Sequence, residues 1–380
     1  MSFSTKLPKV GTTIFSRINQ VARAHGATNL SQGFPGFPPD EELLKEVEAA
    51  LHDRQNQYAP MPGVKSLRDS LCAKMKQLYG HSYDPESEIT ITAGATQAIF
   101  TAISAFVEKG DEVIVFKPAY DCYEPAIELY GGKPVLIEMR APKYQIDWEE
   151  VRANISSRTK MIIINTPHNP TGTIWQKEDL LQLQKLVENT NILILSDEVY
   201  EHIIFDGKAH QSAARFPKLA ERALIVYSFG KTFHVTGWKL GYCLAPKELM
   251  KEFRKIHQYN VFCVNHPMQV GLKNYLQNPE HYLGLPKFYQ RKRDFFLEAI
   301  KDSKLEFIPA QGTYFQTVSY KNITDEKDTD FAIRLIEEKQ LATIPVSGFN
   351  KNKRDEKMLR ICFAKEDDTL KKAAKIINSL

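Results

Sequence analysis

The 380-residue chain has few cysteines, and they lack the spacing of a structural site. The five residues are odd in number, widely separated and without a C-x-x-C pair: Cys72, Cys122, Cys243, Cys263 and Cys362. This pattern argues against a disulfide framework and against a structural zinc site. We therefore expect reduced thiols and no metal ligands.

Long hydrophobic runs are also missing. No segment approaches the roughly 18 consecutive apolar residues that would span a membrane, and the first 20 residues lack the apolar centre of a secretory signal. The sequence therefore predicts a cytoplasmic protein with no membrane partner.

Neither sign of charge dominates the chain. Fifty Lys and Arg residues stand against 46 Asp and Glu residues, and the formal net charge is +4. This balance predicts no nucleic-acid partner and favours small-molecule ligands. Since 43% of the residues are hydrophobic and 11% aromatic, the chain can bury a sizeable core.

Short β-branched runs alternate with helical patterns from residue 88 onward, which is typical of βαβ units. The runs at 161–164 and 192–195 are apolar on both faces, as expected of parallel strands covered by helices on both sides. The run 239–246 follows the run 223–230 too closely for a crossover helix to lie between them. This strand is therefore expected to be antiparallel to its neighbour. The sequence thus predicts an α/β fold with a seven-stranded, mostly parallel sheet. The other strands are expected at 88–94, 111–118, 133–138, 161–167, 192–199 and 223–230, and the helices between them at 96–108, 148–155 and 177–188.

The pattern changes after about residue 280 to that of a smaller α+β unit. Its helices are expected at 288–299, 329–339 and 366–378, and its strands at 305–308, 313–318 and 358–363. Ahead of the sheet, Asp40 is expected to cap a helix that reaches Leu51. The charged run 351–357 is expected to be a solvated loop. We divide the chain into an N-terminal arm with part of the small domain (1–40), a large domain (41–280) and a small C-terminal domain (281–380).

Polar residues follow the predicted strands, where ligands bind in open α/β sheets. They are Gly94-Ala95-Thr96, Tyr120 with Asp121, Asn165 and Asn169 in NTPHNPTG, Asp197 and Tyr200 in SDEVYEH, and Ser228 and Lys231 in SFGKTFHVTGWK. Each has a structural alternative when taken alone: a turn for NPTG, an ion pair for Asp197, a surface position for Lys231. Together they offer an anion site, a carboxylate and an amine. An amine that forms a Schiff base and a carboxylate for a pyridinium nitrogen are the two protein groups that pyridoxal 5'-phosphate requires.

The chain resembles fold-type I, class I aminotransferases, in the branch of methionine aminotransferases and of kynurenine and glutamine transaminases. The resemblance covers nearly the whole sequence. It rests on eight segments in the same order: NLSQGFPGFPP (29–39), NQYAPMPGVKSLR (56–68), TAGATQAI (92–99), PAYDCYEP (118–125), NTPHNPTG (165–172), SDEVYEH (196–202), SFGKTFHVTGWKLGY (228–242) and LRICFAK (359–365).

This resemblance implies roles toward pyridoxal 5'-phosphate. Lys231 would carry the cofactor and move the α-proton, and Asp197 would keep the pyridine nitrogen protonated. Asn169 and Tyr200 would bind the phenolic oxygen, and Tyr120 would stack on the ring. The phosphate would be bound by residues at the start of a helix, by Lys239 where the family often has arginine, and by one tyrosine of a second subunit: Gly94, Ala95, Thr96, Ser228, Lys239 and Tyr58. Because Tyr58 would act across subunits, the resemblance implies a homodimer with shared active sites.

The same resemblance implies how substrate binds. Arg360 would bind the carboxylate of the amino acid, Gly33 and Asn169 would lie beside it, and Phe15 would line the side-chain pocket. The segment 261–266, expected to reach across the dimer, contains no Lys or Arg. The expected donor is therefore methionine, followed by phenylalanine, tyrosine, histidine or glutamine, with a 2-oxo acid as acceptor.

Several alternatives remain open at this point. A carbon–sulfur lyase would use the same cofactor and lysine, and an aspartate transaminase would need a second cation. The fold also serves as a non-enzymatic effector sensor, although no DNA-binding head is recognised here. The S-x-x-K at 228–231 lacks the S-D-N and K-T-G companions of a serine acyl-enzyme. A dinucleotide enzyme would need G-x-G-x-x-G, which the sequence lacks.

Overall fold

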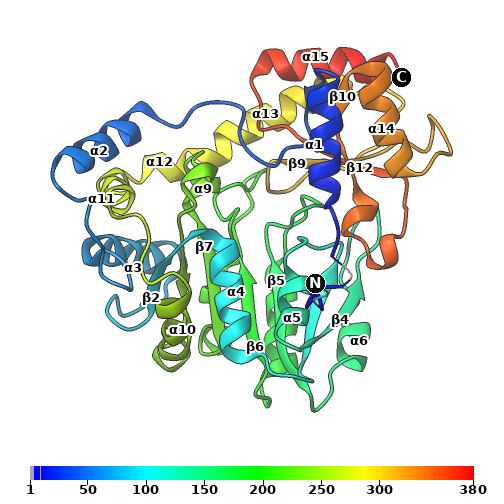
Figure 1. Cartoon of the computed structure of the whole chain (residues 1–380). Helices are drawn as coiled ribbons and strands as arrows, with labels where there is room; N and C mark the ends of the chain where they lie inside the picture. Colours follow the sequence, from blue (N-terminus) through cyan, green and yellow to red (C-terminus); the bar gives the residue numbers. More distant parts are fainter. Residues whose placement is uncertain (1–3, 9) are drawn as a thin grey trace.

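A seven-stranded sheet lies at the centre of the larger part of the molecule (Figure 1). The computed structural model describes residues 4–8 and 10–380; residues 1–3 and 9, which belong to the expected N-terminal arm, lie outside the described residues. The strand order is β2-β8-β7-β6-β5-β3-β4. β8 runs antiparallel to β2 and β7, and the other neighbours are parallel, as predicted. The strands are β2 (Ile89–Thr92), β3 (Glu112–Lys117), β4 (Lys133–Glu138), β5 (Thr159–Asn165), β6 (Leu193–Asp197), β7 (Ala223–Ser228) and β8 (Gly241–Leu244).

Helices cover both faces of this sheet because its central strands are apolar on both sides. Along β5, Ile162 and Ile164 belong to one hydrophobic cluster, whereas Met161 and Ile163 belong to a second. α4 (Gly94–Phe106), α5 (Tyr123–Leu129) and α10 (Lys247–Asn260) cover the second cluster, on the near face in Figure 1. The opposite face packs against α3 (Lys65–Tyr79), α6 (Trp148–Ala153), α7 (Lys177–Val187) and α8 (Pro217–Ala220).

A smaller α+β unit contains the C-terminal part of the chain and an N-terminal segment. Its antiparallel sheet has the order β11-β12-β9, and β1 pairs in parallel with β10. α1 packs against α14, so the blue and orange helices lie side by side in Figure 1. The elements are α1 (Ile14–Ala24), β1 (Thr28–Asn29), α13 (Leu285–Ile300), β9 (Phe315–Ser319), α14 (Asp328–Lys339), β10 (Leu341–Ala342), β11 (Ile344–Pro345), β12 (Met358–Cys362) and α15 (Asp367–Asn378).

Short helices and turns connect these two parts. α2 begins directly after Asp40, whose carboxylate accepts a hydrogen bond from the backbone N–H of Glu42 at 2.7 Å. The predicted cap is therefore present, and the helix packs against α11. The connecting helices are α2 (Glu41–His52), α9 (Phe229–Thr232), α11 (His266–Tyr275) and α12 (Glu280–Leu283), and the 3-10 turns are η1 (Ala213–Arg215), η2 (Thr236–Trp238), η3 (Val346–Phe349) and η4 (Lys351–Lys353).

Three local expectations differ from the structure. The strand expected at 305–308 is reduced to one antiparallel bridge between Glu306 and Ser319. The run 351–357 is largely half-buried rather than solvated, because Arg354 pairs with Glu138 and Glu356. Helix α1 was not predicted within the arm, and it forms because its buried Ile18 and Ala22 have a partner surface in the C-terminal unit. The division at residues 40 and 280 stays a prediction.

Candidate active site

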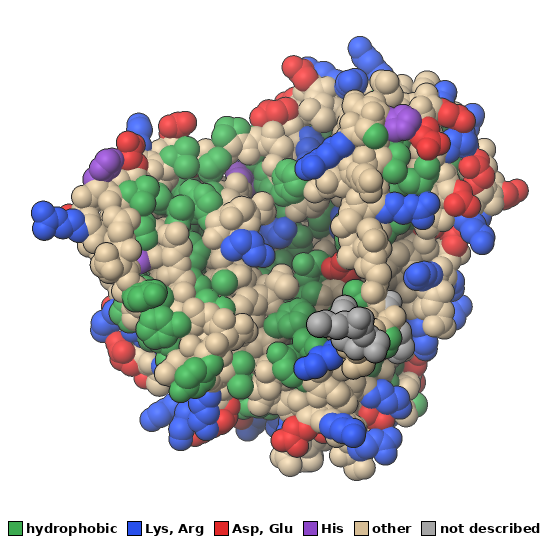
Figure 2. Space-filling model, viewed as in Figure 1, with side chains coloured by type: hydrophobic (Ala, Val, Ile, Leu, Met, Phe, Trp, Pro, Cys, Tyr) green, Lys and Arg blue, Asp and Glu red, His purple; other side chains and the backbone are tan. Residues whose placement is uncertain are grey.

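A cavity of about 370 Å³ opens at the carboxyl ends of the parallel strands. Gly94 follows β2, Asp197 ends β6 and Ser228 ends β7, so the parallel topology brings their side chains to one edge. Figure 2 shows this face of the molecule hollowed, with Lys and Arg side chains among hydrophobic ones near its middle. Every expected site residue except Tyr58 lines the cavity: Phe15, Gly33, Gly94, Ala95, Thr96, Tyr120, Asn169, Asp197, Tyr200, Ser228, Lys231, Lys239 and Arg360.

Lys231 places its amine inside this cavity. The residue lies in the short helix α9, directly after β7. Its Nζ donates a hydrogen bond to the carbonyl oxygen of Gly33 at 3.0 Å, and the Tyr314 hydroxyl donates to the same oxygen at 2.7 Å. Burial lowers the pKa of the Lys231 ammonium to about 8. A fraction of the amine is therefore neutral near neutral pH and can act as a nucleophile or base.

Asp197 is a buried carboxylate at the end of β6. Its Oδ2 accepts a hydrogen bond from the Tyr123 hydroxyl at 2.5 Å, and its Oδ1 accepts a longer one from the Val199 N–H at 3.4 Å. Burial raises the pKa of Asp197 to about 6, against the lowering effects of these hydrogen bonds and of Lys231. The group is mostly ionised at neutral pH and would be stabilised by a cationic partner.

Two asparagines connect this strand end to the small unit. Asn165 donates to the Asp197 carbonyl oxygen at 2.9 Å and accepts from the Asn169 N–H at 2.9 Å. Asn169 in turn accepts a hydrogen bond from Nη1 of Arg360 at 2.8 Å. The side chain of Asn169 is thereby placed between the Asp197 strand and the arginine of β12.

Arg360 is a buried cation, 1% exposed. Nη2 donates to the Ser31 carbonyl oxygen at 3.1 Å, and the Phe315 ring lies 3.9 Å from the guanidinium carbon. Nε has no hydrogen-bond partner in the described part of the chain. Although burial lowers the pKa of Arg360 to about 10, the side chain stays charged at neutral pH. Its two hydrogen-bond acceptors, the Asn169 side-chain oxygen and the Ser31 carbonyl oxygen, are neutral, so a carboxylate ligand would supply the missing counter-charge.

The start of α4 is a candidate anion site. Ala93 precedes this helix and provides no side-chain cap, so the first backbone N–H groups are open to a ligand. Gly94 has a φ of 75°, and a Cβ added there would lie 3.6 Å from Nζ of Lys239, which places that ammonium at the helix start. Thr96 and Tyr120 approach each other with their hydroxyls 3.5 Å apart. Backbone N–H groups, a hydroxyl and an ammonium together suit a phosphate.

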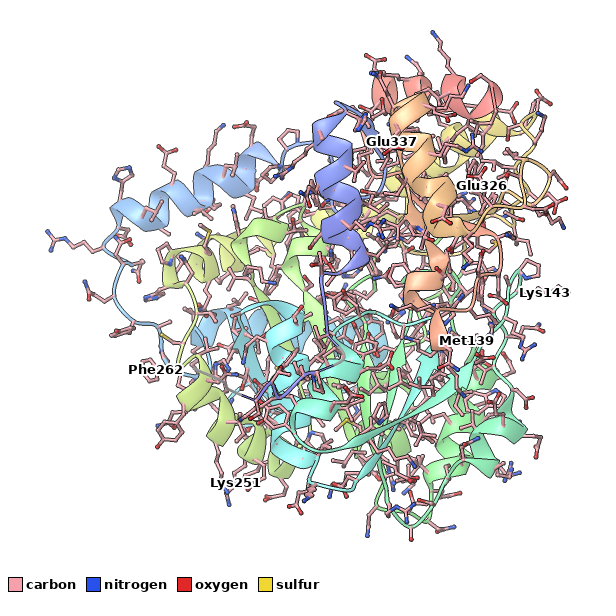
Figure 3. The ribbon with its side chains drawn as sticks, turned by 45° about the vertical axis from the view of Figure 1, so that its right-hand side comes forward. Met139, Lys143, Lys251, Phe262, Glu326 and Glu337 are labelled. Carbon is pink, nitrogen blue, oxygen red and sulfur yellow. The ribbon has the colours of Figure 1, made fainter. Side chains whose placement is uncertain are left out.

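Tyr58 is the one expected site residue that the fold does not bring to this cavity. Its side chain is 83% exposed, and its ring packs edge-on against Phe262 with centroids 5.6 Å apart. Figure 3 shows Phe262 at the edge of the molecule. Within one chain, Tyr58 therefore lies on an outer face.

Sequence reasoning missed two residues that contact the site. Tyr123 begins α5 three positions after Tyr120, and a second phenol so close to the expected ring-stacking residue was the signal that could have singled it out. Lys365 ends the LRICFAK segment; it is buried, and its Nζ donates to the carbonyl oxygens of Phe34 at 2.9 Å and Gln32 at 3.4 Å. Lys365 thus anchors the segment that carries Gly33.

A larger cavity of about 730 Å³ lies on another side of the molecule. Met139 and Lys143, labelled in Figure 3, line it together with part of the segment that leads to α7. None of the expected site residues lines it.

Within residues 4–8 and 10–380, no group of three or more His, Cys, Asp and Glu side chains is arranged to bind a metal ion. Among the helices of the same residues, none is both long and apolar enough to cross a membrane.

The fold agrees with comparisons to known proteins. The chain belongs to the family of class I and II aminotransferases, whose model matches residues 26–377. It is accordingly an enzyme of the transaminase class, which confirms the predicted family, fold and reaction class. This family uses pyridoxal phosphate.

Individual relatives cover almost the whole chain. A methionine aminotransferase of Escherichia coli is 46% identical over 377 residues, which are 99% of this chain and 98% of that protein. The human kynurenine–oxoglutarate transaminase 3 is 33% identical over 405 residues, covering 98% of this chain and 89% of that protein. The crystal structure of YbdL from Escherichia coli, with an identified methionine aminotransferase function, superposes with a TM-score of 0.97 at 45% identity and covers 100% of both chains.

Proposed function

We propose that the chain binds pyridoxal 5'-phosphate in the 370 Å³ cavity and transfers the amino group of methionine to a 2-oxo acid. The observation that carries this proposal is the convergence, in one cavity, of the Lys231 amine, the Asp197 carboxylate and the anion site at α4. These are the groups that the aldehyde, the pyridine nitrogen and the phosphate of this cofactor need.

The anion site and the ring partners would hold the cofactor from opposite ends. The N–H groups of Ala95 and Thr96, with Ser228 and Lys239, would bind the phosphate. The Asp197 carboxylate would face the pyridine nitrogen. The positive charge of this nitrogen would offset the free energy that burial of the carboxylate costs. Asn169 and Tyr200 would donate hydrogen bonds to the phenolic oxygen, and Tyr120 would stack on the ring.

When bound, the cofactor supplies an electron-poor ring that accepts the electron pair left on the substrate α-carbon. Lys231 would remove and return the α-proton, because its buried amine loses its own proton at a pH near 8. The hydrogen bond from Nζ to the Gly33 carbonyl oxygen supports this role, because Gly33 is expected to lie beside the substrate carboxylate.

Arg360 would bind the substrate carboxylate. Its Nη atoms now donate to Asn169 and to the Ser31 carbonyl, two neutral acceptors that a carboxylate can replace or supplement. A Cβ on Gly33 would lie 3.0 Å from the Phe315 ring and 3.9 Å from Nη2 of Arg360. Glycine at this position therefore leaves room beside the guanidinium.

The cations of the cavity restrict the substrate side chain. Lys231, Lys239 and Arg360 line it, and each already has a role toward cofactor or α-carboxylate. Phe15, Phe34 and Phe315 are the aromatic residues on the substrate side. A neutral side chain fits this lining, since burying a second carboxylate without a cation is costly. Together with the similarity to the Escherichia coli methionine aminotransferase, this favours methionine, followed by phenylalanine, tyrosine, histidine or glutamine.

One experiment tests the cofactor and another the substrate. Purified protein should be yellow, and borohydride should attach the cofactor irreversibly to the peptide that contains Lys231; a label on another lysine would refute the assignment. Initial rates should then be compared for methionine, phenylalanine and aspartate at equal concentration with a 2-oxo acid. Faster turnover of aspartate than of both others would contradict the specificity but leave the cofactor site intact. Release of pyruvate and a thiol from cystathionine without an acceptor would instead indicate the lyase.

We further propose a homodimer with shared sites. Tyr58 is 83% exposed, and its ring packs against that of Phe262, which is 42% exposed. Exposed aromatic side chains in such a group favour burial by a partner. A second copy of the chain would cover this face and receive the Tyr58 hydroxyl at its phosphate site.

A further inference from the structure

Tyr123 contacts the carboxylate that faces the proposed cofactor. It is the first residue of α5, whereas Asp197 is the last residue of β6. The phenolic hydroxyl donates to Oδ2 of Asp197 at 2.5 Å. Both residues are buried, with exposed fractions of 2% and 4%.

Among the residues that the structure describes, the Tyr123 hydroxyl has one hydrogen-bond partner, the Asp197 carboxylate. The Tyr123 ring packs in the apolar cluster under α4, together with Ala98, Leu195 and Val226. Burial, with the nearby negative charge of Asp197, raises the pKa of Tyr123 well above its ordinary value. The phenol therefore keeps its proton and remains the donor, and the carboxylate remains the acceptor. A buried phenol without that acceptor would be destabilising.

The two oxygens of Asp197 consequently differ. Oδ2 is occupied by a short hydrogen bond, and Oδ1 has the 3.4 Å contact from the Val199 N–H. Because Asp197 also lines the cavity, Oδ1 is the oxygen left to meet a ligand.

We propose that Tyr123 is a positioning residue that holds Oδ2 of Asp197, aims Oδ1 at the ring nitrogen of the cofactor and keeps the carboxylate ionised. This inference rests on the proposed cofactor site and deepens it. The same turn also carries Tyr120, whose ring lies edge-on to that of Tyr123 with centroids 5.9 Å apart. Two residues at one helix start would thus orient the cofactor ring: Tyr120 by stacking on its face, and Tyr123, through Asp197, at its nitrogen.

The charge state of Asp197 depends on every titratable group around it. Lys231 from α9 favours the ionised form, and Glu198 on the same strand end disfavours it. Cys122, Tyr120 and Tyr200 also face it, and each keeps its proton because burial raises its pKa. Of these neighbours, Tyr123 is the side chain that donates a hydrogen bond directly to the carboxylate.

The test uses the substrate-free enzyme loaded with cofactor. Tyr123→Phe keeps the ring and removes the donor, so the pKa of Asp197 rises and its carboxyl group competes for the proton of the ring nitrogen. A ring without that positive charge withdraws less electron density from the nitrogen that links the cofactor to Lys231. This linking nitrogen then keeps its proton to a higher pH. We expect the pH midpoint of the visible absorbance change to move upward by roughly 0.5–1 unit, and kcat/KM to fall by about 10-fold to 100-fold.

Two further variants separate positioning from packing. Tyr130→Phe removes the same atom from the other end of α5 and should leave the midpoint unchanged. Replacement of Tyr123 by 3-fluorotyrosine keeps the shape but strengthens the donor, so the midpoint should move downward. This second variant also decides the matter if Tyr123→Phe folds poorly.

The outcomes are distinguishable. A midpoint that moves upward in Tyr123→Phe and downward with fluorotyrosine supports the inference. Equal midpoints in wild type, Tyr123→Phe and the fluorotyrosine protein would overturn it, as would an equal shift of the midpoint when Asp197 is already replaced by Asn. Borohydride labelling of Lys231 in the wild-type enzyme tests the cofactor site separately. Labelling of Lys231 together with unchanged midpoints would show that the cofactor site is correct but that Tyr123 does not position Asp197.

Discussion

At the scale of single residues, the cavity holds three charged side chains that are removed from water, Asp197 and Arg360 almost fully and Lys231 in part. Burial shifts the pKa of Lys231, Asp197 and Arg360 toward their neutral forms, to about 8, 6 and 10. Each charge is less stable in the cavity than in water. A ligand of opposite charge therefore stabilises it by a larger free energy than it would in water. The same shifts make the stability of the cofactor-free protein depend on pH.

Asp197→Asn should stabilise the cofactor-free protein at pH 7. The folded pKa of Asp197, about 6, lies above the ordinary value of 3.8, so the folded state binds the proton more tightly. Its contribution to stability is therefore present below about pH 4 and is lost as pH rises to about 6. At pH 7 the ionised group costs on the order of 1–3 kcal/mol, which asparagine removes while still accepting from Tyr123. Denaturant unfolding of both proteins at pH 4.5 and pH 7 measures the difference. A variant less stable than wild type at pH 7 would contradict this.

Arg360→Lys should weaken substrate binding without changing side-chain preference. Lysine keeps the charge but loses the two-pronged geometry toward a carboxylate. We expect kcat/KM to fall by about 10-fold to 100-fold for every amino acid, with the ratio of methionine to phenylalanine unchanged. A fall in kcat/KM for only one of the amino acids would contradict this and would indicate that Arg360 contacts the substrate side chain instead of the carboxylate.

At the scale of elements, the segment 32–36 closes the cavity and is held from outside it. Lys365 follows β12 and donates to the carbonyl oxygens of Phe34 and Gln32. Its ammonium also lies 4.8 Å from the centre of the Phe34 ring. The N–H of Gly36 donates to the Ala364 carbonyl at 2.8 Å. These contacts tie the Gly33 segment to the strand that carries Arg360.

Lys365→Met should therefore impair substrate binding more than cofactor binding. Methionine fills similar space but leaves two carbonyl oxygens without their donor, so Gly33 is held less firmly beside Arg360. We expect KM for methionine to rise by about 10-fold with the visible spectrum of the cofactor unchanged. Lys371→Met, an exposed change on α15, is the matched control. Unchanged KM in the Lys365 variant would remove this role.

At the scale of the whole molecule, the position of Tyr58 requires a second chain if it acts at a phosphate site. It lies outside the cavity of its own chain, on a face where its ring packs against the exposed side chain of Phe262. Association would bury this face and complete the anion site from across the interface.

Mixed dimers should show this sharing directly. Tyr58→Phe alone should weaken cofactor binding while leaving the dimer intact, and Lys231→Ala alone should be inactive. In a hybrid of the two variants, one site combines the intact Lys231 of the first chain with the intact Tyr58 of the second. Mixing under exchanging conditions should therefore restore cofactor affinity and activity at that site. No restoration despite hybrid formation, or an active monomer by sedimentation, would refute the shared site.

The sequence by itself determined the sheet, the family and most of the lining of the cavity. Apolar strands with polar residues directly after them predict a parallel sheet with its site at the carboxyl ends, because parallel strands end at one edge. Gly94, Asn169, Asp197 and Lys231 each stand next to such a strand end. Their convergence follows from chain order and sheet topology alone.

The tertiary structure alone decided which distant groups meet and how deeply they are buried. Arg360 and Asn169 are 191 residues apart, and Lys365 and Phe34 are 331 residues apart. The contact of Tyr123 with Asp197 depends on the packing of α5 against the sheet. No local pattern encodes such pairs, because they form only when separate elements pack together. The pKa values of Lys231 and Asp197 have the same origin, since burial is a property of the folded molecule and not of the residue.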